Sequence, residues 1–258
     1  MKKVVIVGGG NLAESVAVAV AGSTELCLQQ IYLRNAERGA VLSTLTDAPF
    51  ATFEQELACA DIYLLAVSDS AIGELSRKLH FAPGAVVAHT AGSSSIEVID
   101  PTLRRAVLYP MQSFSQGRRV DFGVIPIFVE SSDEQTLIEV EEVAQQLSNT
   151  VVRLNSEERR RLHLSAVFVC NFINAMFTAG EELVGESRLP FEILKPLIEE
   201  CCAKACCANS PREVQTGPAA RGDFATIEKH TSMLDGKPEL REIYQNISKY
   251  IWETSKKI

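Results

Sequence analysis

Residues 4–13 read VVIVGGGNLA, and residues 14–21 continue as a stretch rich in alanine and valine. Four β-branched residues, three glycines and that stretch predict a strand, a tight turn and the start of a helix. The spacing is G-x-G-x-x-A, in which the first glycine permits the turn, the second lets a diphosphate approach the backbone, and the small third residue lets helix and strand pack closely. The pattern indicates a dinucleotide site, with a simple glycine turn as the alternative. We expect the phosphates to bind at the free amide groups of the helix start, against Gly8, Gly10, Asn11, Leu12 and Ala13.

The composition argues against several classes of partner. The chain has 258 residues and a formal net charge of −8. Nucleic acids and anionic membranes are bound by basic surfaces, so neither is expected as a partner. Seven cysteines, an odd number, and no N-terminal stretch that resembles a secretion signal predict free thiols in a cytoplasmic protein. The longest apolar stretch, residues 162–179, contains histidine, serine, asparagine and threonine, so we expect a buried helix rather than a membrane span.

Strand-like and helix-like segments alternate through residue 154. After the first strand, further strands are expected at 26–33, 51–53, 61–67, 85–89, 106–109, 125–129 and 150–154, and helices at 70–79 and 133–147. Strands separated by helical segments predict a doubly wound, mainly parallel α/β sheet of the Rossmann type. We therefore expect a dinucleotide-binding domain over residues 1–154.

The pattern becomes helical from Asn155 onward. Asn155 with Glu158 three residues later is a helix-start signature. Helices are expected at 155–187, 190–208, 223–234 and 238–256, with a loop-like segment at 209–222. The sequence therefore predicts an all-helical domain over residues 155–258 that serves substrate binding and dimerisation.

The end of the second predicted strand bears on the choice of nucleotide. Sites for NAD usually place an acidic residue there to bind the ribose hydroxyls. This chain has Arg34, Asn35 and Arg38 at and just after that point. Arginine suits a 2′-phosphate through charge-assisted hydrogen bonds. We predict NADP rather than NAD, with ordinary surface arginines as the alternative.

Two further strand ends are candidates for the nicotinamide half of the cofactor, because ligands of parallel sheets lie beyond the carboxyl ends of the strands. We expect Val67, Ser68 and Ile72 to line its path after the strand at 61–67. His89 is expected to do so at the end of the next strand. The alternative is that these turns only cap and connect elements.

Two polar motifs occur in the predicted helical domain. His163 and Asn171 contribute to a polar strip on the long apolar helix, and buried polar groups need partners. Residues 216–223 form a shaped, glycine-containing loop before a helix that carries His230. We assign Asn171 to substrate positioning, His163 or His230 to proton transfer, and Arg221 to a substrate carboxylate. The alternatives are a structural histidine at 163 and a surface arginine at 221.

The paired cysteines Cys201-Cys202 and Cys206-Cys207 lie among alanines. Because a free cysteine behaves as a small apolar residue, we interpret them as helix-packing residues and expect no metal, with a metal or redox role as the alternative.

The chain resembles a known group of proteins in the glycine turn, in residues 89–93 (HTAGS), in residues 109–115 (YPMQSFS) and in the two helical motifs. Its order of elements is similar to pyrroline-5-carboxylate reductase, ketopantoate reductase, the β-hydroxyacid dehydrogenases and the deazaflavin-dependent NADP reductases. It most resembles a bacterial group of Rossmann-like oxidoreductases with a C-terminal helical domain of unknown function. The resemblance extends over nearly the whole chain and implies that fold and an oxidoreductase activity.

One position departs from these relatives. In the β-hydroxyacid dehydrogenases and ketopantoate reductase, a lysine four residues before the corresponding asparagine transfers a proton. Here Val167 occupies that position and cannot transfer one. The relatives' mechanism therefore does not carry over, and His163 is the nearest substitute.

These observations predict an NADP-dependent oxidoreductase with a small, carboxylate-bearing substrate held between the two domains. The alternative is a non-catalytic NADP(H) sensor or scaffold, which the missing lysine favours. The helix over residues 162–183 is so apolar that we also expect a homodimer through the helical domain.

Overall fold

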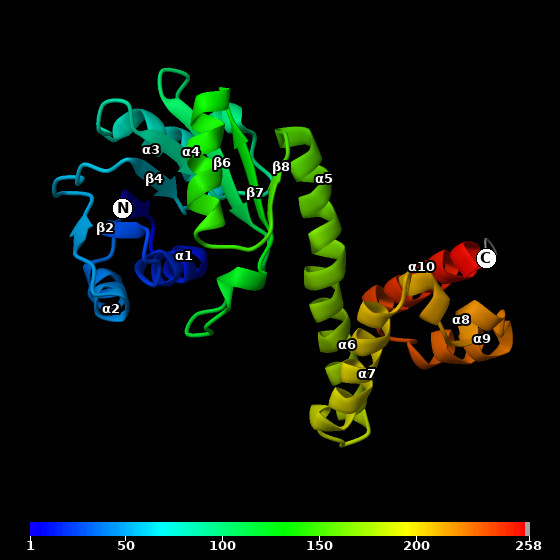
Figure 1. Ribbon diagram of the computed structural model, residues 1–258. Helices are drawn as coiled ribbons and strands as arrows, with labels where there is room; N and C mark the ends of the chain where they lie inside the picture. The colour runs from blue at the N-terminus through cyan, green and yellow to red at the C-terminus, as the bar shows by residue number, and fades with distance from the viewer. Residues whose placement is uncertain (256–258) are drawn as a thin grey trace. The chain divides into compact units, whose positions relative to one another are not determined.

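The computed structural model describes residues 1–255 and contains one eight-stranded sheet in that range (Figure 1). The strands are β1 (Lys2–Val7), β2 (Leu26–Leu33), β3 (Phe50–Thr52), β4 (Ile62–Leu65), β5 (Val86–His89), β6 (Arg104–Pro110), β7 (Ile127–Ser131) and β8 (Val151–Arg153). Their order across the sheet is β3-β2-β1-β4-β5-β6-β7-β8. Neighbouring strands are parallel except for β6 and β7, which run antiparallel. The prediction of a mainly parallel Rossmann-type sheet is confirmed.

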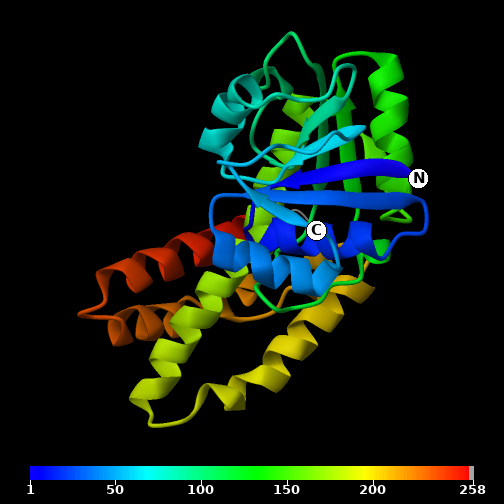
Figure 2. The ribbon, with the colours of Figure 1, turned by 90° about the vertical axis from the view of Figure 1, so that its left-hand side faces the viewer.

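Helices cover both faces of this sheet. They are α1 (Asn11–Ala21), α2 (Ala36–Thr46), α3 (Asp69–Lys78) and α4 (Glu134–Gln145), with short 3₁₀ turns at Ile96–Val98 and Phe122–Val124. Figure 2 shows α3 and α4 on opposite sides of the strands. Apolar residues of α1 and α4 share one buried cluster, and those of α3 belong to a second.

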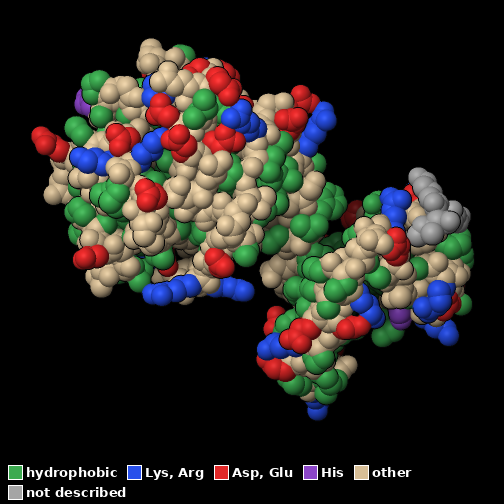
Figure 3. Space-filling view, viewed as in Figure 1, with side chains coloured by type: hydrophobic (Ala, Val, Ile, Leu, Met, Phe, Trp, Pro, Cys, Tyr) green, Lys and Arg blue, Asp and Glu red, His purple; other side chains and the backbone are tan. Residues whose placement is uncertain are grey.

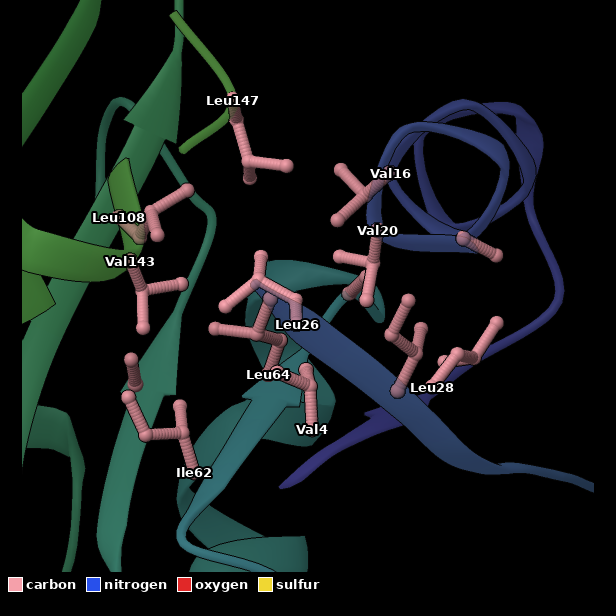
Figure 4. Packing of buried hydrophobic residues seen from close by; sticks show 14 of the residues in the cluster. Val4, Val16, Val20, Leu26, Leu28, Ile62, Leu64, Leu108, Val143 and Leu147 are labelled. Atoms are coloured by element: carbon pink, nitrogen blue, oxygen red, sulfur yellow. The ribbon is translucent and has the colours of Figure 1, made fainter. Parts of the chain in front are cut away.

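The core explains why the strands read as continuous apolar runs. Val4 of β1 belongs to the cluster under α1 and α4, whereas its neighbour Val5 belongs to the cluster under α3. A strand that is buried on both faces has apolar residues at successive positions rather than alternating polar and apolar ones. Figure 4 shows Val16 and Val20 of α1 pointing toward the strands that carry Leu26 and Leu64. Each such side chain stabilises the fold by about 1.5–3 kcal/mol when fully buried.

Helices account for the regular structure after β8 in the part of the chain that is described. The elements are α5 (Ser156–Ala166), a π-helical segment (Val167–Phe172), α6 (Ile173–Glu186), α7 (Lys195–Cys207), α8 (Pro218–Arg221), α9 (Phe224–Met233) and α10 (Pro238–Ser255), with 3₁₀ turns at Phe191–Leu194 and Pro211–Val214. Two of these, α8 and the turn at 211–214, lie in a segment that we expected to be a loop. The predicted start at Asn155 is confirmed, because Asn155 and Glu158 form a reciprocal capping box.

The chain divides into two compact units, residues 1–171 and residues 172 onward. The change from strands to helices comes earlier, between the end of β8 and the start of α5. The expected domain boundary at 154/155 stays a prediction. It falls at that change of structure, whereas the first compact unit also includes α5 and most of the π-helical segment.

The long apolar helix is exposed, and our expectation of a buried helix was wrong for the single chain. None of its most apolar window within Ser156–Glu186 is buried, and Leu164 and Val169 are among its exposed large side chains. Figure 3 shows hydrophobic side chains on the visible face over α6 and α7. With a mean hydropathy of 1.5, this is the one helix in the described range that is long and apolar enough to cross a membrane. A helix that packs against another protein surface has the same composition.

Candidate functional site

The glycine turn between β1 and α1 requires glycine at its first position. Gly8 has a φ of +136°, and a Cβ there would lie 2.1 Å from the carbonyl oxygen of Ala66 at the end of β4. Its amide donates a hydrogen bond of 2.8 Å to the carbonyl oxygen of Tyr32. Any larger residue would force β1 and β4 apart. Ala13 is completely buried where α1 meets the sheet, so its small side chain permits the close packing.

The start of α1 is open and uncapped. Gly10 is the N-cap residue, no side chain caps the helix, and a Cβ on Gly10 would meet nothing within 4 Å. The first amide groups of a helix have no partner inside the helix, so they are free to bind an anion here. The turn, with space above Gly10 and amide groups facing it, fits the diphosphate of a dinucleotide. Asn11 donates a hydrogen bond of 3.2 Å to the carbonyl oxygen of Phe114, which brings the loop after β6 beside the helix start.

The three residues predicted to select the nucleotide have different surroundings. The Arg38 Nε donates a hydrogen bond of 2.9 Å to the carbonyl oxygen of Gly9, and its guanidinium forms an ion pair with Glu14 of α1. Arg38 thus braces the turn. Asn35 caps α2 by accepting a hydrogen bond of 2.9 Å from the Arg38 amide. Arg34 is exposed and forms no ion pair within residues 1–255, so its guanidinium is free to bind a phosphate.

At the strand ends, two of the predicted cofactor contacts are inaccessible. Val67 is half-buried and Ser68 exposed, so both can meet a ligand. Ile72 and His89 are completely buried, which corrects their assignment to the cofactor surface. Ile72 belongs to the apolar cluster under α3, because it lies on the inner side of that helix.

His89 is a neutral structural histidine. Its Nδ1 accepts a hydrogen bond of 3.1 Å from the Ala91 amide, and its Nε2 lies 3.3 Å from the carbonyl oxygen of Ser95. Nε2 therefore carries the proton and donates it to that carbonyl. Burial and the nearby charge of Arg159 lower the pKa of His89 to about 4. Through these two hydrogen bonds the His89 side chain holds the loop at residues 90–95 to the end of β5.

Hydrogen bonds to Asp69, the first residue of α3, hold the same loop on its other side. The hydroxyls of Ser93 and Ser94 donate hydrogen bonds of 2.5 and 2.8 Å to one carboxylate oxygen of Asp69. Partial burial acts to raise the pKa of Asp69, but these hydrogen bonds bring it below its usual value. The loop after β5 is thus held in one conformation at the carboxyl edge of the sheet.

A pocket of about 610 Å³ opens beside this edge, entirely within the first compact unit. Residues of three segments line it: Tyr109 from β6, Met111, Gln112 and Ser113 from the following loop, and Leu162, His163, Ser165, Ala166, Val167, Val169, Cys170 and Asn171 from α5 and the π-helical segment. The pocket brings together His163 and Asn171, which the sequence placed two helical turns apart. Val167, the residue in the position of the relatives' lysine, also lines it.

The π-helical segment supplies four lining residues of the pocket: Val167, Val169, Cys170 and Asn171. A π-helical turn changes the angular position of every residue after it, and such turns are frequent at functional sites. Our expectation of one regular helix over residues 155–187 is therefore wrong in that stretch. No sequence pattern marks a π-helical turn, so this feature could not be predicted.

The His163 imidazole is hydrogen-bonded to a residue that sequence reasoning did not assign. Its Nδ1 lies 3.2 Å from the hydroxyl of Tyr109, and the two rings meet edge to face. Tyr109 lies within a stretch that carried the family resemblance, but its partner is 54 residues away in the chain. The packing of α5, through Leu162, against the apolar cluster that contains Tyr109 brings the two together.

Behind this pair lies a buried cation. Arg159 of α5 is 1% exposed, forms an ion pair of 3.1 Å with Glu130, and donates a hydrogen bond of 2.6 Å to the carbonyl oxygen of Ser94. Its Nε and Nη1 have no hydrogen-bond partner within the described residues. Although it is paired with Glu130, the positive charge of Arg159 still acts on Tyr109 and works to lower the pKa of that phenol.

The two remaining predicted site residues, Arg221 and His230, belong to the second compact unit. Asp223 caps α9 by accepting a hydrogen bond from the amide of Thr226. Arg221 is exposed, as the alternative of a surface arginine expected. His230 is exposed and hydrogen-bonded through Nδ1 to the Tyr244 hydroxyl at 2.9 Å. Neither residue lines the pocket described above.

The cysteines are free throughout the described chain. Cys201, Cys202, Cys206 and Cys207 are all exposed rather than packed between helices. Among residues 1–255, no group of three or more His, Cys, Asp or Glu side chains could hold a metal ion.

Fold and site together define a dinucleotide-type Rossmann protein with a pocket at the carboxyl edge of the sheet. A Rossmann-like domain model matches residues 1–112, and a domain of unknown function, DUF2520, matches residues 125–251. A structure from Bacteroides fragilis described as a "putative NADP oxidoreductase" is 36% identical, with 98% of each chain covered and a TM-score of 0.90. The chain therefore belongs to the family of Rossmann-like proteins with a C-terminal DUF2520 domain.

More distant structures share the fold. A protein of Thermotoga maritima is 22% identical, with 98% of each chain covered and a TM-score of 0.75. The 1-pyrroline-5-carboxylate reductase of Streptococcus pyogenes is 12% identical, with 100% of this chain and 99% of that chain covered and a TM-score of 0.61. No curated protein matches the chain.

Proposed function

We propose that this protein is a nicotinamide-dinucleotide-dependent oxidoreductase. The observation that carries the proposal is the open, uncapped start of α1 above a turn that only glycine can form. The description of the Bacteroides fragilis relative as a "putative NADP oxidoreductase" supports it. The pocket beside the carboxyl edge of the sheet supplies a place for a substrate close to where such a cofactor ends.

NADP is the proposed cofactor, in preference to NAD. The support is the exposed, unpaired guanidinium of Arg34 just beyond β2, together with the lack of an acidic residue at the usual ribose position. Arg38 contributes by bracing the glycine turn. Val67 and Ser68 remain the proposed contacts of the nicotinamide half.

The bound cofactor would supply the hydride, and the chain would supply orientation and a proton. His163 is the proposed proton-transfer group, since it lines the pocket and an imidazole is suited to acid–base work near neutral pH. Asn171 would position the substrate from the π-helical segment. Arg221 and His230 remain proposals as a carboxylate ligand and an alternative proton carrier. We propose a small, carboxylate-bearing substrate.

A sensor or scaffold that binds NADP(H) without turnover is the second candidate. It is favoured by Val167, which lines the pocket in the position where related enzymes have a proton-transferring lysine. The two candidates share the cofactor site and differ only in the pocket.

One experiment separates the candidates. Purified protein is titrated with NADPH by fluorescence, and cyclic imines, 2-oxoacids and 3-hydroxyacids are then screened for a change in nicotinamide absorbance. Binding with turnover supports the oxidoreductase, whereas binding without turnover across the panel supports the sensor. Absence of NADPH and NADH binding contradicts both. Asn171→Ala should lower turnover at unchanged NADPH affinity, and Asn149→Ala, at a residue outside the pocket, is its control.

We also propose a cytoplasmic homodimer whose interface covers the exposed apolar helix. The support is the set of large apolar side chains that the single chain leaves exposed between α5 and α6. Contiguous apolar surface of that kind usually marks an interface.

A further inference from the structure

The pocket contains a phenol to which the proposed function gives no role. Tyr109 is at the carboxyl end of β6, is 8% exposed, and has its hydroxyl 3.2 Å from the Nδ1 of His163. We propose that Tyr109 donates the proton that a reduced carbonyl or imine substrate needs, and that His163 restores that proton through their shared hydrogen bond. This inference rests on the proposed function and deepens it.

The pair is held in a defined geometry from two sides. A Cβ on Gly92 would lie 2.6 Å from the Nδ1 of His163 and 2.7 Å from the Cζ of Tyr109. The loop after β5 thus touches both rings and leaves no room for a side chain at Gly92. On the sheet, Phe128 of β7 packs against Tyr109 with ring centroids 6.2 Å apart. Groups that are fixed before the reaction lose little entropy when they act.

The charges around Tyr109 suit a group that holds its proton and then releases it. Burial raises the pKa of Tyr109, so the phenol stays protonated at neutral pH. The positive charge of Arg159 acts in the opposite direction and lowers the pKa in part. As the proton leaves, the negative charge that develops on the phenol oxygen is attracted to Arg159, which has two buried nitrogens without hydrogen-bond partners.

The proposed step balances in atoms and charge. A bound reduced nicotinamide would supply a hydride to the substrate carbon, and the electron pair of the C=O or C=N bond would move to the oxygen or nitrogen. That atom takes the proton of the Tyr109 hydroxyl and becomes an alcohol or amine. The phenol oxygen regains a proton from the Nδ1 of a protonated His163, which is left neutral. The imidazole then takes up a proton from water.

A merely structural hydrogen bond is the competing explanation. In that case Tyr109 would orient the imidazole, and no proton would pass through the phenol. The two cases differ in kcat. Loss of a proton donor lowers kcat by about 10²–10⁴-fold, whereas loss of one orienting contact has a smaller effect that falls on KM as well.

The test compares the full-length wild type with Tyr109→Phe, which removes only the hydroxyl, and with His163→Gln. Tyr63→Phe is the matched control, because Tyr63 is a buried phenol of β4 whose hydroxyl donates to the carbonyl oxygen of Ala58, away from the pocket. We measure the Kd for NADPH by fluorescence, the ¹⁵N signals of the histidine rings by NMR, and kcat on a cyclic imino acid, pyruvate and acetoacetate.

The expected result for Tyr109→Phe is a fall in kcat of about 10²–10⁴-fold, with an unchanged Kd for NADPH and a shifted Nδ1 signal of His163. His163→Gln should also lower kcat, with an unchanged Kd for NADPH. Tyr63→Phe should retain wild-type kcat. If the wild type turns over a substrate and Tyr109→Phe does so equally fast, the inference is overturned while the proposed function stands. If the wild type binds NADPH but reduces nothing, the proposed function and this inference both fail.

Discussion

At the scale of single residues, Arg34 and Arg38 have different interactions, although the sequence motif gave both the same predicted role in binding the nucleotide. Arg38 is engaged by Gly9 and Glu14, so its charge is already compensated inside the protein. Arg34 has no such partner in the described chain. A guanidinium without an internal partner is the one that can give its hydrogen bonds to a ligand phosphate.

We therefore expect Arg34→Ala to weaken NADPH binding by about 10- to 100-fold, the value of one or more charged hydrogen bonds, and to leave NADH binding unchanged. Arg38→Ala should weaken both nucleotides equally, because it loosens the turn beneath the shared diphosphate. Fluorescence titrations of each variant with each nucleotide give the comparison. Undiminished preference for NADPH in Arg34→Ala would show that another group reads the 2′-phosphate.

The buried His89 makes stability depend on pH. Its pKa is lowered to about 4 in the folded chain, so the folded state resists protonation while the unfolded state takes up a proton near pH 6.5. The stabilisation is complete above pH 6.5 and is lost as the pH falls toward 4, by up to about 3 kcal/mol. Urea unfolding at pH 7, 6, 5 and 4 should show this loss in the wild type. The same series on His89→Gln should show a shallower one, and equal slopes would contradict the assignment.

At the scale of elements, the β1–α1 turn separates a folding role from a binding role. Gly8 faces the backbone of β4, whereas Gly10 faces open space at the helix start. The sequence motif does not distinguish the surroundings of the two glycines. They differ because the backbone of Ala66, directly after β4, lies against Gly8 and not against Gly10. Substitution at each should therefore affect a different property.

Gly8→Ala should lower the free energy of unfolding by about 2–4 kcal/mol, because the residue has a positive φ and its Cβ would collide with a carbonyl oxygen. Gly10→Ala should cost less than about 1 kcal/mol, since its backbone conformation suits any residue. The Gly10 variant should instead lose NADPH affinity, as its methyl group fills the space for the diphosphate. Urea unfolding and nucleotide titration of both variants test the pair. Full NADPH affinity in Gly10→Ala would argue against the proposed cofactor site.

At the scale of the whole molecule, the apolar helix that α5 begins and α6 continues is left uncovered by a single chain. Leu164 is 58% exposed, and other large apolar side chains of this helix are exposed as well. Removing such apolar surface from water is favourable. We propose that a second copy of this chain covers it. Such a dimer would bury residues next to the pocket.

We expect wild-type protein to have the mass of a dimer by light scattering at micromolar concentration, and Leu164→Glu to shift it toward the monomer. The control is Val124→Glu, which places the same charge on an apolar residue 73% exposed in the first unit. The control should keep the wild-type mass. A wild-type monomer would contradict the proposed interface.

Local sequence patterns were enough to predict most of the sheet and its helices. The second strand, residues 26–33, has the predicted bounds, and the capping box at Asn155 was read from two residues. These features depend on neighbours in the chain, so a local pattern contains their cause. Two features had no local signal in the sequence: the antiparallel pairing of β7 with β6, and the π-helical segment. Both follow from tertiary packing rather than from the periodic spacing of apolar residues.

The chain's own order of residues determined that there is a Rossmann sheet with a glycine turn at its first crossover, and helices after residue 155. Periodicity, caps and glycine spacing are local, and each acts through residues a few positions apart. Tertiary packing alone decided that Arg38 pairs with Glu14, that Ile72 and His89 are closed to ligands, and that Tyr109 meets His163. Those outcomes depend on which helices and strands become neighbours, and residues far apart in the chain carry no mutual pattern before the elements pack together.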